Sequence, residues 1–326
     1  MREILLVQLK RIGDIVLTAP VVPALKKKYP DARITIAIDA AFASLSEILP
    51  ADDFLFFKKK SGNRDFWRRL FSRKWDECLE FTGTDRGVLI AALSRAGTRA
   101  TYSRHQGFWQ RIAMNRFVPA DVKSLHTVDY HLALAEAGSE SLECPFRISQ
   151  DLSDRMAKRL EDCGVARPFA VVHPGTARAE KMWSARNWER VVRFLRDEAH
   201  LAVVFTGGTD PSEMTQIQTI CDLAGREGLV SLAGTTSISE MAAVISRAQV
   251  FAGVDTGASH IADLLGIPSA VLFARTNPRH WGPRGTKGFA VGAREFTRHP
   301  HDFPKSEMSD IPFENFAAAL REILPK

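Results

Sequence analysis

Short apolar runs recur along this chain and alternate with amphipathic segments. In the first half the runs cover residues 4–9, 33–39, 54–57 and 77–81, and in the second half 169–172, 201–205, 229–232, 250–254 and 269–273. Compact apolar runs bounded by turn residues are typical of buried parallel strands. Helical spacing is clearest at 87–96, 184–198 and 313–324. Strands that alternate with helices predict doubly wound parallel sheets of the α/β class.

The alternation weakens and restarts once, which predicts two domains. It weakens from Glu136 to Pro168, and we place the boundary near residue 160, with an N-terminal domain over 1–160 and a C-terminal domain over 161–326. A chain of 326 residues suits two domains better than one. We therefore expect two Rossmann-like domains that face a central cleft. The last helix is expected to pack back across their interface.

Composition and charge narrow the class of protein. The chain is 45% hydrophobic and 25% charged, as in ordinary globular proteins. Its net charge of +6 indicates an anionic partner, which could be a phosphorylated substrate, a membrane surface or nucleic acid, or else a solvated basic surface without a partner. No apolar run is long enough for a transmembrane segment. Four scattered cysteines without a CxxC spacing favour reduced thiols, a cytoplasmic location and no metal site.

Basic and aromatic residues are dense between Lys58 and Arg116. Phe66, Trp67, Leu70, Phe71 and Trp75 recur at helical spacing, which predicts either a core stripe or a membrane-facing stripe. The surrounding Lys and Arg residues could line a groove for a phosphorylated acceptor held at a membrane. Nucleic acid is not expected as a partner, because no recognised nucleic-acid motif accompanies these residues.

The segment FAGVDTGASHIADLLG, residues 251–266, reads as a strand, a tight polar turn and a helix. Free N–H groups at the start of such a helix, and the positive end of its dipole, favour an anion. Thr256 and Gly257 would face the anion, and His260 lies one turn along the helix. Asp255 would repel a phosphate, so it would orient Thr256 or a lysine, or contact a sugar hydroxyl. The alternative is an ordinary strand-to-helix turn with Asp255 as a cap.

In each domain, a further candidate loop follows the first strand. In the second domain HPGTARAEKMWSARNW brings Thr176 and Lys181 to the end of its strand, where Lys181 could meet a diphosphate or could be a solvated loop residue. In the first domain Gly13 allows a tight turn and Asp14 stands in the first helical turn. Asp14 either caps that helix or acts as a general base at the ligand-binding end of the sheet.

Two common nucleotide-binding motifs are missing. No GxGxxG follows a strand at the required place, and no GxxxxGK[ST] occurs anywhere in the sequence. These absences argue against a nicotinamide enzyme and against a P-loop ATPase.

Taken in order along the chain, four motifs resemble the ADP-heptose:lipopolysaccharide heptosyltransferase family, glycosyltransferase family 9. They are RIGDIVLTAP, HPGTARAEKMWSARNW, the TGG turn with its following glutamate, and GVDTGASHIADLLGIPSAVLF. The resemblance spans almost the whole chain and is looser from about Lys58 to Asp129. It implies a GT-B fold and inverting, metal-independent glycosyl transfer without a cofactor.

The resemblance also implies residue roles. Asp14 would deprotonate the acceptor hydroxyl, and Lys181 would stabilise the departing phosphate. The donor-binding residues would be Gly13, Thr176, Lys181, Glu213 for the ribose, Thr236 near adenine, and Asp255, Thr256, Gly257 and His260 at the diphosphate. The partners would be ADP-heptose and an anionic glycolipid acceptor, an inner-core lipopolysaccharide precursor, at the inner face of the cytoplasmic membrane. Two alternatives remain open: a related enzyme that uses another nucleotide sugar, as a transferase or an epimerase, and a non-catalytic nucleotide-sugar binder.

Overall fold

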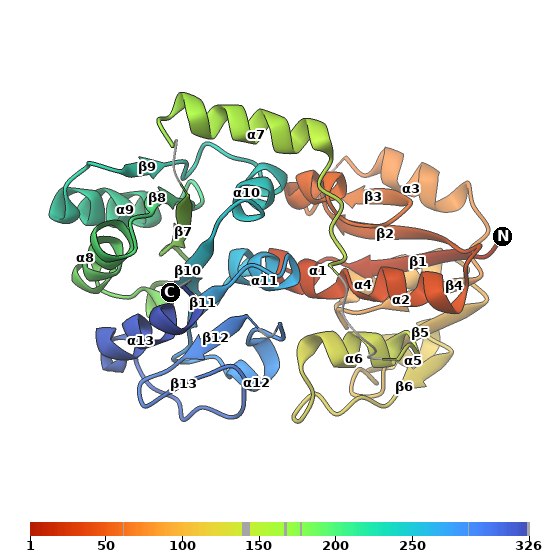
Figure 1. Ribbon diagram of the computed structural model, residues 1–326. Coiled ribbons are helices and arrows are strands. Elements are labelled where there is room, and N and C mark those ends of the chain that lie inside the picture. The colour runs from red at the N-terminus through yellow and green to blue at the C-terminus, as the bar shows by residue number, and fades with distance from the viewer. Residues whose placement is uncertain (61, 139–143, 166–167, 177, 286, 325–326) are drawn as a thin grey trace. The chain divides into compact units, whose positions relative to one another are not determined.

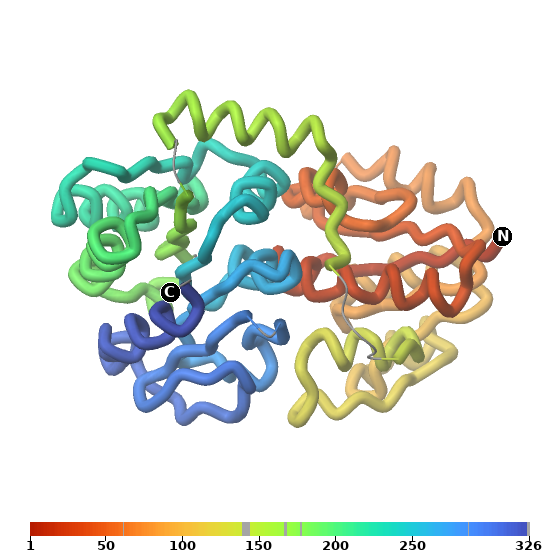
Figure 2. Tube along the Cα trace, in the orientation of Figure 1, coloured from red at the N-terminus to blue at the C-terminus, as the bar shows by residue number. Residues whose placement is uncertain are grey.

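The computed structural model describes residues 1–60, 62–138, 144–165, 168–176, 178–285 and 287–324. The chain divides into two compact units, Met1–Arg147 and Ile148–Lys326. Figure 2 follows the chain from red to yellow through the first unit and from green to blue through the second, so each unit is one continuous stretch. The boundary expected near residue 160 falls inside helix α7 (Gln150–Asp162), which belongs to the second unit. Residues 139–143 and 166–167 of the weakly patterned segment lie outside the described residues.

The first unit is built on a six-stranded parallel sheet (Figure 1). Its strand order is β3-β2-β1-β4-β5-β6. The strands are β1 (Glu3–Gln8), β2 (Arg33–Asp39), β3 (Asp53–Phe57), β4 (Glu77–Glu80), β5 (Thr98–Tyr102) and β6 (Arg116–Val118). The helices are α1 (Ile12–Thr18), α2 (Val21–Lys28), η1 (Ala40–Glu47), α3 (Arg64–Phe71), α4 (Asp85–Leu93), α5 (Phe108–Ala113) and α6 (Thr127–Leu134).

The second unit carries a seven-stranded sheet of order β13-β12-β11-β10-β7-β8-β9, in which only β13 runs antiparallel to its neighbour. The strands are β7 (Phe169–His173), β8 (Ala202–Phe205), β9 (Leu229–Ser231), β10 (Val250–Val254), β11 (Ser269–Leu272), β12 (Gly288–Val291) and β13 (Phe296–Thr297). After α7 come η2 (Ala179–Lys181), α8 (Ala185–Arg193), η3 (Phe194–Glu198), α9 (Pro211–Ala224), α10 (Ile238–Ile245), α11 (Gly257–Leu264), α12 (Pro278–Trp281), η4 (Met308–Asp310) and α13 (Phe313–Ile323).

Both sheets share one winding scheme, so the predicted α/β class with two mostly parallel sheets is confirmed. In each, the first strand of the unit lies inside the sheet, two later strands add on one side, and the remaining strands add on the other, three in the first unit and four in the second. This is the doubly wound order, which opens a crevice where the winding reverses. The reversal falls between β1 and β4 in the first unit and between β7 and β10 in the second.

Buried aromatic rings fix the last helix to the second unit. The rings of Trp183, Trp188 and Phe316 lie 5.4–5.7 Å apart and are fully buried. Nε1 of Trp183 donates a hydrogen bond to the carbonyl of Ile311. Helix α13 also contacts β11 and β12, so it completes the core of its own unit. The expectation that it reaches back to the first unit stays a prediction.

The aromatic stripe of α3 divides between the core and the surface. Phe66 and Leu70 are buried against the sheet, and Trp75, just beyond the helix, is buried as well. Phe71 remains 56% exposed and stacks on Trp67, with 5.9 Å between ring centroids. The stripe is therefore mainly a core contact with an exposed end.

Candidate active site

The donor-side residues of the second unit gather at the point where its sheet reverses direction. Strands β7 and β10 are paired in parallel, and the chain leaves their carboxyl ends towards opposite sides of the sheet. Lys181 follows β7, whereas Asp255 and Thr256 follow β10. Ligands of open α/β sheets bind outside the strand ends at such a reversal.

Lys181 and Asp255 form an ion pair at this point. Nζ of Lys181 lies 2.6 Å from Oδ2 of Asp255 and also donates to the backbone carbonyl of Asp255 at 2.9 Å. The Asp255 side chain is 5% exposed and that of Lys181 is 14% exposed. The loop after β7 is thereby attached to the turn after β10, and Asp255 orients the ammonium group.

His260 completes this cluster from helix α11. Its Nε2 lies 3.6 Å from Oδ1 of Asp255. Burial lowers the pKa of His260, although the Asp255 carboxylate acts in the opposite direction. The imidazole is therefore held neutral at ordinary pH, and Lys181 carries the positive charge of the cluster.

Helix α11 starts directly at the polar turn. The backbone N–H of Thr256 donates to Oγ of Ser259, and the same hydroxyl donates to the carbonyl of Thr256. Gly257 is the first helical residue, so the N–H groups of the first turn point out of the helix next to Lys181. A cation beside a helix N-terminus can hold an anionic group such as a diphosphate.

Glu213 lies between two glycine-containing loops. Asp210 caps α9, which places Pro211 and Glu213 in the first helical turn. Oε2 of Glu213 accepts a hydrogen bond of 2.8 Å from the N–H of Gly208, and the residue is buried. The loop after β7 packs so closely on this carboxylate that a methyl group at Gly175 would lie 2.6 Å from Oε2. Any larger residue at position 175 would therefore force the Glu213 side chain to shift.

A backbone hydrogen bond links the loop after β8 to the loop after β9, which contains Thr236. The N–H of Gly234 donates to the carbonyl of Gly207, which joins the loop after β9 to the loop after β8. Thr236 is half-buried and directly precedes Ser237, the capping residue of α10. Thr176 is buried, and its Oγ1 accepts a hydrogen bond from the N–H of Arg178. The structure therefore places the predicted donor residues of this unit along four neighbouring strand ends.

His173 is a buried member of this edge that the sequence did not single out. Its Nδ1 lies 2.9 Å from Oγ1 of Thr206, which joins the carboxyl ends of β7 and β8. Burial lowers its pKa to about 4. A neutral imidazole bonded to a hydroxyl holds the two strand ends in register, next to Gly175 and Thr176.

In the first unit, Asp14 lies in the first turn of α1, just past β1 and Gly13. Burial raises the pKa of its carboxyl, and the positive charges of Lys10 and Arg11 act against that rise. A carboxylate with a raised pKa accepts a proton more readily. Asp14 in turn raises the pKa of Tyr102 and Tyr130, although burial is the larger cause for both tyrosines.

A cation and a buried hydroxyl share the surroundings of Asp14. The guanidinium of Arg104 lies 5.4 Å from the ring centroids of both Tyr102 and Tyr130. The hydroxyl of Tyr102 is buried and has no hydrogen-bond partner among the residues that the structure describes. Arg104 belongs to the basic segment seen in the sequence, but nothing in its spacing indicates that it would lie over Tyr102 and Tyr130.

Glu80 organises the neighbouring loop at the end of β4. Its carboxylate accepts hydrogen bonds from the N–H groups of Thr82 and Gly83 at 2.8 and 2.9 Å, from Thr101 at 3.1 Å, and a short one from the Thr82 hydroxyl. Burial raises its pKa even so. Because both oxygens of the Glu80 carboxylate accept hydrogen bonds from these residues, Glu80 has a structural role beside the candidate base.

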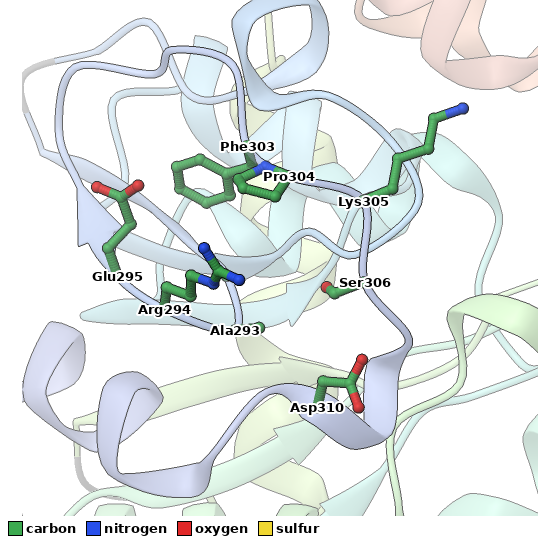
Figure 3. A pocket seen from close by; sticks show the side chains of 9 residues that line it. Ala293, Arg294, Glu295, Phe303, Pro304, Lys305, Ser306 and Asp310 are labelled. Carbon is green, nitrogen blue, oxygen red and sulfur yellow. The ribbon is translucent and has the colours of Figure 1, made fainter.

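A pocket of about 260 Å³ lies elsewhere in the second unit (Figure 3). It is formed by the segments after β12 and before α13, including Arg294, Glu295, Phe303 and Asp310. In Figure 3 the side chain of Lys305 points away from the other labelled side chains. None of the predicted site residues lines this pocket.

Comparison with known proteins identifies the family. The model of glycosyltransferase family 9 (heptosyltransferase) matches residues 63–308, which is most of the chain. The chain belongs to glycosyltransferase family 9. A relative from Escherichia coli, lipopolysaccharide heptosyltransferase 3, is 26% identical over 332 residues, covering 96% of each chain.

Solved structures of similar proteins share the fold. The family 9 glycosyl transferase from Veillonella parvula has a TM-score of 0.86 at 21% identity, covering 99% of this chain and 97% of its own. Escherichia coli heptosyltransferase WaaC, solved with ADP, has a TM-score of 0.77 at 18% identity, covering 98% of this chain and 99% of its own. The two-sheet architecture is thus the GT-B-like fold of family 9. No helix in the described part of the chain combines the length and apolar character needed to cross a membrane.

Proposed function

We propose that this family 9 protein is an inverting heptosyltransferase that transfers heptose from ADP-heptose to an inner-core lipopolysaccharide precursor at the inner face of the cytoplasmic membrane. The observation that carries the proposal is the Lys181–Asp255 ion pair beside the N-terminus of α11. A cation and a helix N-terminus at a sheet reversal suit a nucleotide diphosphate. The ADP bound by the related heptosyltransferase WaaC supports the same nucleotide here.

The second unit would hold the donor. Lys181, Thr176, Thr256 and Gly257 would bind the diphosphate, Glu213 the ribose hydroxyls, and the backbone near Thr236 the adenine. Charge that develops on the leaving ADP would be stabilised by the Lys181 ammonium and the N–H groups of α11, without a metal ion. At about 4 Å and an effective dielectric of 20, such a charge pair contributes about 4 kcal/mol before desolvation.

The first unit would supply the base. The acceptor hydroxyl oxygen attacks the anomeric carbon of the heptose, the bond from that carbon to the ADP oxygen breaks, and the hydroxyl proton passes to Asp14. A single displacement inverts the anomeric configuration. The raised pKa of Asp14 suits this proton transfer, and Lys10 and Arg104 would attract an anionic acceptor. The proposal requires that the first unit present Asp14 to the donor held by the second.

Replacement of Asp14 tests the proposal. We expect Asp14→Asn to reduce transfer from ADP-heptose by about 10²–10⁴-fold, while calorimetry shows unchanged ADP binding. Asp151→Asn is the control, because Asp151 also stands in the first turn of a helix but is exposed. Transfer should persist in excess EDTA, and the product should show an inverted anomeric centre by NMR.

Three outcomes would overturn parts of the proposal. Full transfer by Asp14→Asn would exclude Asp14 as the base. A faster reaction with a UDP-sugar than with ADP-heptose would favour a different transferase or an epimerase. ADP-heptose binding without turnover in the unmodified protein would favour a non-catalytic binder.

A further inference from the structure

Helix α5 turns its large apolar side chains towards solvent. Phe108 is 71% exposed, Trp109 is 65% exposed and Ile112 is 61% exposed. Their spacing places them on one side of the helix. The C-terminal end of the helix is anchored, because Ala113 and the following Met114 pack against the hydrophobic core of the first unit. Side chains of this size are seldom left exposed together without a binding partner.

Helix α4 continues this surface. Leu89 and Leu93, one turn apart, are 50% and 36% exposed. The opposite side of α4 packs Val88 and Ala91 into the same core. Helices α4 and α5, both labelled in Figure 1, contact each other. We call Leu89, Leu93, Phe108, Trp109 and Ile112 the α4–α5 patch.

Three arginines and one aspartate are exposed on or next to the two helices of the α4–α5 patch, and the aspartate, Asp85, lies one turn before Leu89 on α4. Arg86 precedes Leu89 by three residues on α4, Arg95 follows α4, and Arg111 lies on α5. All three residues are exposed. Within the described ranges, neither Arg86 nor Arg95 forms an ion pair. Exposed aromatic and aliphatic side chains with an arginine rim are the composition of surfaces that lie in the headgroup region of a bilayer.

The geometry points to a membrane-binding surface, and we propose that the α4–α5 patch binds an anionic phospholipid bilayer. Phe108, Trp109 and Ile112 would enter the boundary between headgroups and acyl chains, while the arginines contact lipid phosphates. A second copy of this chain is a poorer occupant, because three exposed arginines against one exposed aspartate, Asp85, leave each copy of the patch with an excess of positive charge.

The biological role of this membrane-binding surface rests on the proposed function, in which the acceptor would be a lipid-anchored sugar. The α4–α5 patch and Asp14 belong to the same unit. A bilayer bound at the patch would therefore raise the local concentration of acceptor around the unit that carries the base. Membrane binding itself needs neither the donor nor the base, so the two proposals fail independently.

Vesicle co-sedimentation tests the patch. The full chain should bind vesicles of phosphatidylglycerol and phosphatidylethanolamine, and binding should weaken with salt and be much lower on phosphatidylcholine. The triple variant Phe108→Ser, Trp109→Ser, Ile112→Ser should bind at least about ten-fold more weakly. The double variant Arg86→Gln with Arg111→Gln should lose most of the part of vesicle binding that salt weakens.

Matched controls come from the second unit. Met214 and Leu223 on α9 are 39% and 42% exposed, and their replacement by serine should leave vesicle binding unchanged. Arg226→Gln should also be neutral. The triple variant should retain ADP binding and transfer to a water-soluble acceptor fragment, whereas Asp14→Asn should lose transfer and keep vesicle binding.

Equal binding by the triple variant, or no vesicle binding by the unmodified chain, would overturn the membrane assignment. Sedimentation velocity provides a further check. A dimer that dissociates in the triple variant, together with no vesicle binding, would assign the patch to self-association instead.

Discussion

Lys181 donates a hydrogen bond of 2.6 Å from Nζ to Oδ2 of Asp255, and the side chain of Asp255 is only 5% exposed to solvent. Removing the ammonium would leave that carboxylate buried without its cation. We expect Lys181→Met to lower the free energy of unfolding by about 3 kcal/mol, the lower end for a buried pair. ADP affinity should fall about ten-fold or more, because a charged hydrogen bond to phosphate is also lost.

The double variant Lys181→Met with Asp255→Asn separates these two effects. It should recover most of the stability, because no unpaired charge remains, but it should not recover ADP affinity. Lys158→Met is the control for loss of an exposed lysine on α7. Denaturant unfolding and calorimetry with ADP measure both quantities, and unchanged ADP affinity in Lys181→Met would contradict the assignment.

The close approach of Gly175 to Glu213 predicts a steric coupling. A methyl group at position 175 would lie 2.6 Å from Oε2 of Glu213. We expect Gly175→Ala to destabilise the protein by about 1–3 kcal/mol. In a Glu213→Ala background the same change should cost almost nothing, because the carboxylate is gone. Unfolding of the four proteins in this cycle gives the coupling directly, and additive effects would exclude it.

Buried histidines predict a loss of stability in acid. Burial lowers the pKa of His173 to about 4, against about 6.5 in an unfolded chain. As the pH falls from about 6.5 to about 4, the unfolded state binds a proton that the folded state does not, so stability falls. The full effect of His173 is about 3 kcal/mol. His131, whose pKa is lowered by burial to about 3, acts in the same direction.

Melting temperatures measured across this pH range check the prediction. His173→Asn should show a shallower loss than the unmodified protein. NMR titration of the His173 ring provides an independent reading, since its signals should stay constant until the pH approaches about 4. A midpoint near 6.5 would show that the ring is accessible to water.

Much of the fold could be predicted because the central strands consist of apolar residues. The bounds of β2 and β10 agree with the prediction. Strands β5 and β6 were not predicted, because TRATY and RFV are short and carry arginine or threonine. Helix α5 was not predicted either, since its apolar side faces solvent and its six residues give little periodicity.

Only those residues of the candidate site that belong to a local sequence motif could be predicted. Strand-to-helix turns named Asp14, Lys181 and Thr256 as candidates, because ligands bind at strand ends. The pair His173–Thr206 and the position of Arg104 over Tyr130 depend on which strands become neighbours. Those contacts join residues that are distant in sequence, and no local pattern encodes them.

The shared winding order of the two sheets has a consequence for evolution. Every residue proposed to grip the nucleotide, Gly13 apart, lies in Ile148–Lys326, and the proposed base with its cationic surroundings lies in Met1–Arg147. Each half has its own complete sheet and its own hydrophobic core. If the proposed roles hold, selection could change the acceptor by altering one half of the chain, while the half proposed to bind the activated sugar is inherited unchanged.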